Sequence, residues 1–190
     1  MHLLIIALLL SAVVSRQAQS SESIQTDVRG VWRTAVEEIV RSRSVRIVVF
    51  NESVGICVRA AQQPCFDLPE SGAAAIPADD RNRLLAAQSS KPLAIEGLNL
   101  PQVQPMARQE LDALYFHFGN PEVFWPEFYA RFPGSAGYVL MSAPAFDESR
   151  QAAWVLMEHS HLAGGQRLLL FLKRNASAWE IARRVVLWQV

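Results

Sequence analysis

The stretch "MEHSHLAGG", residues 157–165, places a glutamate and two histidines within four positions. Carboxylate and imidazole side chains serve as zinc ligands and as general acids and bases, so this stretch is the first candidate for chemistry. If strand geometry continues to His161, the two imidazoles lie on one face about 7 Å apart and Glu158 points to the other face. The glycines and polar residues that follow favour a different prediction, in which His161 has left the strand and lies at a solvated hairpin tip.

A metal centre needs more than these two imidazoles. A zinc site takes at least three protein ligands, and the remaining histidine of the mature chain, His117, lies on an aromatic segment. We therefore interpret Glu158, His159 and His161 as a hairpin that carries imidazoles, and we predict no metal, no cofactor and no catalytic residue. A small hydrolase or metal-dependent enzyme that uses this hairpin is the alternative.

Other catalytic patterns in the sequence are incomplete. Ser142 falls on an expected strand rather than in the Gly-x-Ser-x-Gly turn of hydrolases. A triad of Ser142, His159 and Asp147 is conceivable, but triads are defined by geometry that a sequence does not supply. The sequence contains no phosphate-binding loop, no dinucleotide fingerprint and no zinc helix motif.

The first twenty residues are typical of an export signal. Residues 3–14 form an apolar run interrupted only by Ser11, which is too short for a bilayer, where about 20 residues are needed. Small residues follow, so we predict cleavage after Ser20 or after Ala18, with an uncleaved N-terminal anchor as the alternative. The mature protein is then one domain, residues 21–190, that is periplasmic or secreted and has no stable transmembrane segment.

Charge and cysteine content agree with export and exclude some partners. The chain has 18 basic and 18 acidic residues, so no net charge attracts it to nucleic acid or to anionic lipid. Cys57 and Cys65 are the two cysteines, and in an exported chain such a nearby pair predicts one disulfide that closes a small loop. Two free thiols are the alternative.

The elements that position these residues follow from periodicity. Apolar residues at helical spacing predict a helix over residues 28–40 that Thr26 caps. Two β-rich runs around Asn51, Glu52 and Ser53 predict a hairpin. Helices are expected to begin near Asp79 and near Pro126, the aromatic end of residues 106–118 could be helix or strand, and a strand is expected around residues 93–98. The last fifty residues predict four strands, at 137–146, 151–159, 166–174 and 179–190.

These elements predict an α+β domain. An N-terminal amphipathic helix packs on an antiparallel sheet whose C-terminal part is a four-stranded meander. A cystatin-like or nuclear-transport-factor-2-like arrangement is possible, and it fixes no function.

The aromatic segment "PEVFWPEFYARF", residues 121–132, has two interpretations. Trp125, Phe128, Tyr129 and Phe132 could line a groove for a sugar or a peptide. Large rings more often pack in a core, and we expect Phe128, Tyr129 and Phe132 to point inward.

The C-terminal third of the chain resembles a family of secreted bacterial proteins. The resemblance rests on an aromatic segment, a Pro-Gly-Ser-x-Gly turn, a Gly-rich hairpin and two tryptophans. The matching residues are Trp125, Phe128, residues 133–137, Ser142, Phe146, Ala153, Gly164, Gly165, Lys173, Trp179 and Trp188. Members often carry cysteine in the Gly-rich hairpin, where this chain has "HSHLAGG". The family has no assigned activity, so the resemblance implies a fold rather than a function.

The sequence therefore predicts an exported, non-enzymatic binding protein. Its expected partner is an unknown envelope or extracellular protein or peptide, bound through the sheet or through the aromatic face.

Overall fold

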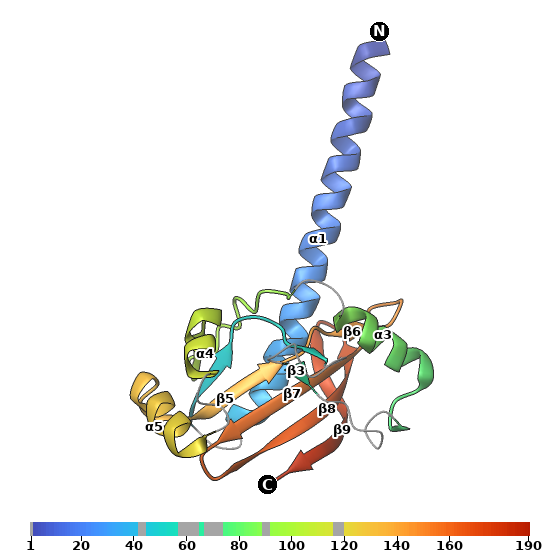
Figure 1. The fold of residues 1–190 in the computed structure, drawn as a ribbon. Helices are drawn as coiled ribbons and strands as arrows, with labels where there is room; N and C mark the ends of the chain where they lie inside the picture. The colour runs from blue at the N-terminus through green and yellow to red at the C-terminus, as the bar shows by residue number, and fades with distance from the viewer. Residues whose placement is uncertain (1, 42–44, 57–64, 67–73, 89–91, 116–119) are drawn as a thin grey trace.

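The computed structural model describes residues 2–41, 45–56, 65–66, 74–88, 92–115 and 120–190 (Figure 1). The helices of these residues are α1 (His2–Arg41), α3 (Ala78–Gln88), α4 (Arg108–Tyr115) and α5 (Pro121–Arg131). The strands are β1 (Arg46–Phe50), β2 (Gly55–Ile56), β3 (Cys65–Phe66), β4 (Val103–Met106), β5 (Ser135–Met141), β6 (Ala145–Phe146), β7 (Ala152–His161), β8 (Gly164–Asn175) and β9 (Ala178–Gln189).

A seven-stranded mixed sheet forms the centre of the domain, so the predicted α+β class is confirmed. Its order is β4-β1-β5-β7-β8-β9, and β6 pairs with Ala153 and Trp154 of β7 on the edge that β5 also occupies. The strands β5, β7, β8 and β9 are antiparallel neighbours in chain order, as the predicted C-terminal meander requires. Short turns join them, one before Ala152 and one at Ala176 and Ser177.

The predicted antiparallel pairing is wrong for the N-terminal part of the sheet, and so is the hairpin expected at residues 51–53. β1 pairs in parallel with β4 on one side and with β5 on the other, and β2 pairs with β3. The physical reason is burial on both faces, because Ile47, Val48, Val49 and Phe50 are all buried. A strand covered on both faces is a continuous apolar run and belongs in the interior of a sheet rather than in an exposed hairpin.

The chain after β1 makes a different pairing from the expected hairpin. The Ile95 amide donates to the Asn51 carbonyl, and the Ser53 amide donates to the Leu93 carbonyl. This pairing is a single bridge between Glu52 and Ala94, so the strand expected at residues 93–98 is reduced to one residue.

Helix α1 packs its predicted apolar stripe on the sheet. All seven stripe residues are buried: Val28, Val31, Trp32, Ala35, Val36, Ile39 and Val40. The predicted cap at Thr26 is wrong, because α1 continues without a break from His2, and the Thr26 hydroxyl donates to the Glu22 carbonyl inside the helix. The N-terminal part of α1 extends away from the domain (Figure 1). Among the described residues, no helix combines the length and the hydropathy that crossing a membrane requires.

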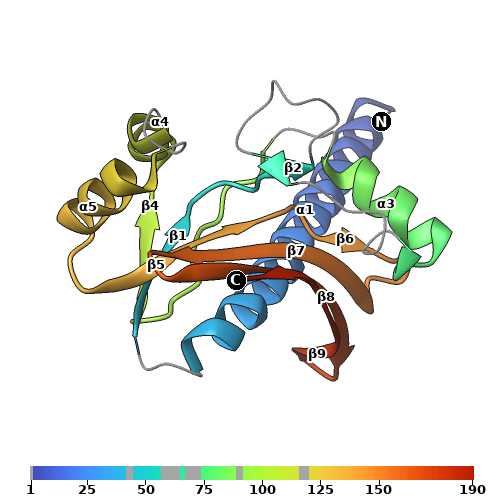
Figure 2. The same ribbon diagram turned by 60° about the horizontal axis from the view of Figure 1, so that its bottom comes forward.

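The sheet separates two apolar cores. One core lies between the sheet and α1 and contains Val49, Val139, Met157 and Leu170. The other lies on the opposite face, where Leu84 of α3, Leu114 of α4 and Phe128 of α5 cover Val48, Leu140, Leu156 and Leu169. Figure 2 shows α4 and α5 together at one end of the sheet and α3 at the other.

The helix expected near Asp79 is confirmed as α3, and residues 108–115 form a helix rather than a strand. The helix expected near Pro126 begins five residues earlier, at Pro121, and contains Pro126. Proline fits the first helical position because its missing N–H is unpaired there anyway. The interior proline is tolerated because Phe124, Trp125 and Phe128 bury their rings from the same helix.

Candidate binding pocket

Strand β7 decides where the first candidate residues lie. It continues to His161, which is opposite Gly164 across a turn of Leu162 and Ala163, so the prediction that His161 has left the strand is wrong. The cause is the turn itself, since Gly164 has a φ of 141° and lets β8 begin at once. His159 and His161 share the face toward α1, with ring centroids 5.2 Å apart, while Glu158 points to the face that α5 covers.

The His159 ring packs against the backbone of the sheet. His159 is 1% exposed, and its Nε2 atom lies 3.1 Å from the Ala136 carbonyl oxygen. In the part of the chain that the structure describes, no group of three or more His, Cys, Asp or Glu side chains could hold a metal. His117 lies outside the described residues. Glu158 and the two histidines therefore do not converge on one centre.

The conceivable triad does not assemble either. The buried Ser142 hydroxyl accepts from the Leu156 amide at 2.9 Å and donates to the Ala143 carbonyl, so it completes the sheet. His159 is opposite Val139 in the ladder, three positions along β5 from Ser142, which is roughly 10 Å at the rise of a strand.

Asp147 organises the turn between β6 and β7. Burial, which raises the pKa of this carboxyl, is outweighed by hydrogen bonds from the Ser149 hydroxyl and from the backbone amides of Ala152, Gln151 and Ser149, so the pKa lies below its ordinary value. The group is thus held charged as a turn-stabilising acceptor.

The predicted disulfide is not decided by this structure. Cys57 lies outside the described residues, and only the backbone of Cys65 is described, in β3. The pairing of Cys57 with Cys65 stays a prediction.

A buried ion pair on the α5 side of the sheet was not predicted from the sequence. Glu158 Oε2 accepts from Arg167 Nε at 2.9 Å and from Arg167 Nη2 at 2.7 Å, and Glu158 Oε1 accepts from the Ser160 hydroxyl at 3.1 Å. The two charged side chains are 11% and 15% exposed. One signal could have found it: in a hairpin with a two-residue turn after His161, Glu158 must face Arg167.

A cavity of about 280 Å³ opens above this ion pair. Its walls come from the start of α5 on one side and from the end of β9 on the other, and strands β5, β7 and β8 form its floor. The lining residues are Pro121, Phe124, Trp125, Tyr138, Glu158, Ser160, Gly164 and Trp188. We call this cavity the α5 pocket.

Trp188 reaches the pocket because β8 carries glycine beside it. Trp188 is opposite Arg167 in the ladder, and the Arg167 guanidinium lies 5.9 Å from the centre of its ring. A Cβ added at Gly165 would lie 3.0 Å from the Trp188 ring and 2.7 Å from the His159 carbonyl oxygen. A side chain at position 165 would therefore push the indole out of its place.

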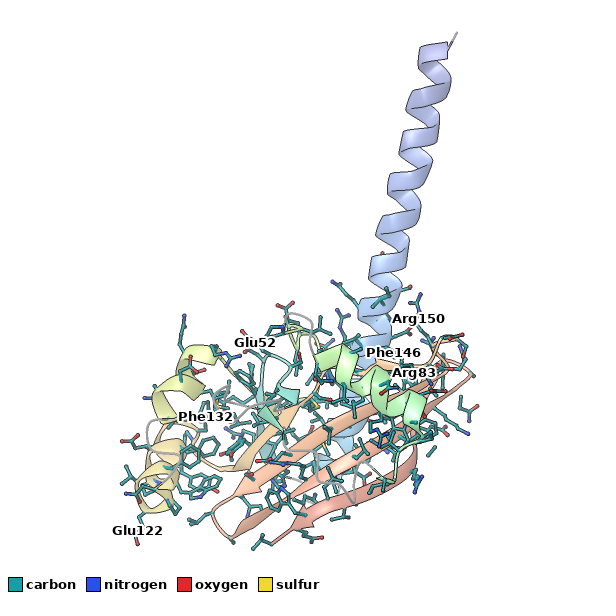
Figure 3. All side chains as sticks on the ribbon, turned by 45° about the vertical axis from the view of Figure 1, so that its right-hand side comes forward. Glu52, Arg83, Glu122, Phe132, Phe146 and Arg150 are labelled. Carbon is teal, nitrogen blue, oxygen red and sulfur yellow. The ribbon has the colours of Figure 1, made fainter. Side chains whose placement is uncertain are left out.

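The α5 wall is a stack of aromatic rings. Trp125 stacks against Tyr129, with centroids 5.6 Å apart, and against Tyr138, with centroids 5.9 Å apart. Phe128 and Phe132 are buried below it, as expected from the packing interpretation, and Trp125 lines the pocket. In Figure 3, Glu122 at the start of α5 points away from the domain.

Two larger hollows lie elsewhere on the described part of the chain. One, of about 450 Å³, is lined by uncharged residues of β1, β4 and the segment 95–101. The other, of about 610 Å³, lies where α1 leaves the domain near Arg150 (Figure 3), and its buried Asp27 forms ion pairs with Arg150 and Arg174. That cluster fastens α1 to the β6–β7 turn and to β8.

No protein-family model, no curated protein and no solved structure matches this chain. The chemistry of the α5 pocket therefore carries the functional argument.

Proposed function

We propose that the chain is an exported, non-enzymatic binding protein that recognises an envelope or extracellular component through a small ring-shaped group held in the α5 pocket. The observation that carries this proposal is the pocket itself. Aromatic side chains form its walls and the polar residues Glu158 and Ser160 form its floor, which is the usual composition of a ligand site. The charge of Glu158 is balanced by Arg167. A volume of about 280 Å³ is slightly below the range of sites for drug-sized ligands, so it suits a single ring.

The state of Glu158 supports binding rather than catalysis. A general acid or base has to exchange a proton with its substrate. The two oxygens of Glu158 already accept bonds from Arg167 and Ser160. Glu158 is thus a fixed hydrogen-bond acceptor in the floor of the α5 pocket.

Nuclear magnetic resonance with ring compounds tests the pocket. We expect a mixture of small uncharged ring compounds to shift the indole N–H signal of Trp188, and the variant Trp188→Ala to abolish the binding. The matched control is Val186→Ala, because Val186 lies on the same strand, is 49% exposed and does not line the pocket. Equal binding by wild type and Trp188→Ala would show that the pocket is not the site.

Export is tested separately. N-terminal sequencing of the protein from the extracytoplasmic fraction should begin at Ser21 or at Gln19, according to the predicted cleavage sites. Recovery of the uncut chain from the cytosol would contradict export without bearing on the pocket.

A further inference from the structure

We infer that the group held in the α5 pocket is an uncharged sugar ring that presents two neighbouring hydroxyls to Glu158 and Ser160. This inference rests on the proposed function and names its ligand class.

The floor of the pocket offers two adjacent acceptors. Among the described residues, Glu158 Oε1 accepts one bond, from Ser160, and a carboxylate oxygen can accept two. The Ser160 hydroxyl donates its single proton in that bond, so its lone pairs remain as acceptors. The two oxygens are 3.1 Å apart, which is comparable to the spacing of the oxygens in a vicinal diol. Two neighbouring hydroxyls of a sugar can therefore donate side by side.

The charge balance of the floor selects a neutral ligand. Glu158 and Arg167 neutralise each other at 2.7 Å, and both are largely buried. An anionic ligand would place its charge against the acceptor oxygens of Glu158 and Ser160. A cationic ligand would compete with Arg167 for the carboxylate, and disrupting a buried ion pair is costly.

The walls fit the apolar face of a sugar better than a second aromatic ring. Tyr129 and Tyr138 stack on Trp125, so the aromatic rings on the α5 side already stack on one another. Trp188 closes the opposite side and offers a large apolar surface at the cavity. A pyranose places its C–H face against such a surface while its hydroxyls reach the floor.

Titration of the whole mature protein with three kinds of probe tests this assignment. The probes are neutral methyl hexosides, the charged sugars glucosamine and glucuronate, and para-cresol as a ring with a single hydroxyl. A methyl hexoside has about 13 non-hydrogen atoms, which at about 0.3 kcal/mol per atom gives a Kd on the order of 1 mM. We expect the neutral hexosides to bind and the charged sugars to bind at least tenfold more weakly.

Substitutions in the floor of the pocket test whether the sugar hydroxyls bind there. Ser160→Ala should weaken hexoside binding about fivefold, the usual effect of one lost hydrogen bond, and leave para-cresol binding within twofold. Val186→Ala should change neither, and circular dichroism should show that every variant is folded.

The outcomes separate the two proposals. Binding of para-cresol at Trp188 without hexoside binding overturns the sugar assignment and leaves the proposed function standing. Failure of every probe to perturb Trp188 overturns both. Hexoside binding that Ser160→Ala does not weaken also overturns the assignment, because the diol would then lie elsewhere.

Discussion

Replacing Glu158 by glutamine should destabilise the domain far more than the same replacement of an exposed glutamate. The carboxylate accepts three hydrogen bonds, two of them from the Arg167 guanidinium, and the two side chains are 11% and 15% exposed. Glutamine keeps the shape but takes the Glu158 charge from the buried guanidinium, and breaking a buried pair by removing one partner costs about 3–5 kcal/mol when burial is complete. Because some solvent reaches the pair, we expect a loss of about 2.5 kcal/mol.

Thermal unfolding followed by circular dichroism measures this loss. For a domain of this length, about 2.5 kcal/mol corresponds to a decrease in Tm of about 5–10 °C. The matched control is Glu180→Gln on β9, because Glu180 is exposed and bonds only to the exposed Asn175 side chain in the described hydrogen bonds. That control should shift Tm by less than about 2 °C.

A double variant separates the pair from the fold around it. Glu158→Leu with Arg167→Met removes both charges and keeps apolar volume, so its stability should return close to that of the wild type. The reasoning is refuted if Glu158→Gln lowers the free energy of unfolding by less than about 0.5 kcal/mol. It is also refuted if the loss in the double variant equals the sum of the losses in Glu158→Leu and Arg167→Met measured separately.

Three further predictions concern the groups that join α1 and the turns to the sheet. Asp27→Asn should lower the free energy of unfolding by about 2 kcal/mol, because Asp27 is 7% exposed and pairs with Arg174; urea denaturation measures it, and a loss equal to that of an exposed aspartate would contradict it. The folded pKa of Asp147 is lowered, so its contribution to stability is complete above the ordinary pKa of 3.8 and is lost as pH falls through the lower folded value. Urea titrations across that window should therefore show a shallower acid decline for Asp147→Asn, and parallel curves would exclude the linkage. Trp32→Phe should cost about 1–3 kcal/mol by calorimetry, since the indole N–H donates to the Ser142 carbonyl at 2.9 Å in the core, and an unchanged Tm would show that this bond contributes nothing.

Elements of the fold with a local period could be predicted, and those with distant partners could not. The stripe from Val28 to Val40 and the strand expected at residues 151–159 come from consecutive residues, and both are confirmed. The hairpin at residues 51–53 was wrong because turn residues and β-rich runs do not reveal which strand is the partner. β1 pairs with segments more than fifty positions away, and burial on both faces decides that pairing.

The candidate site likewise combines features that follow from neighbouring residues with features that depend on distant segments. Period-two alternation places Glu158 on the face opposite His159 and His161 once β7 continues to His161, which the sequence analysis did not expect, and the tight turn sets Glu158 opposite Arg167. Trp188 comes to the pocket through the β8–β9 register and the open space at Gly165, and α5 comes to it through packing on Tyr138. The sequence by itself thus determined which side chains share a face, because alternation is a property of neighbouring residues. Only the tertiary structure decided which faces enclose a cavity, because that depends on contacts between segments far apart in the chain.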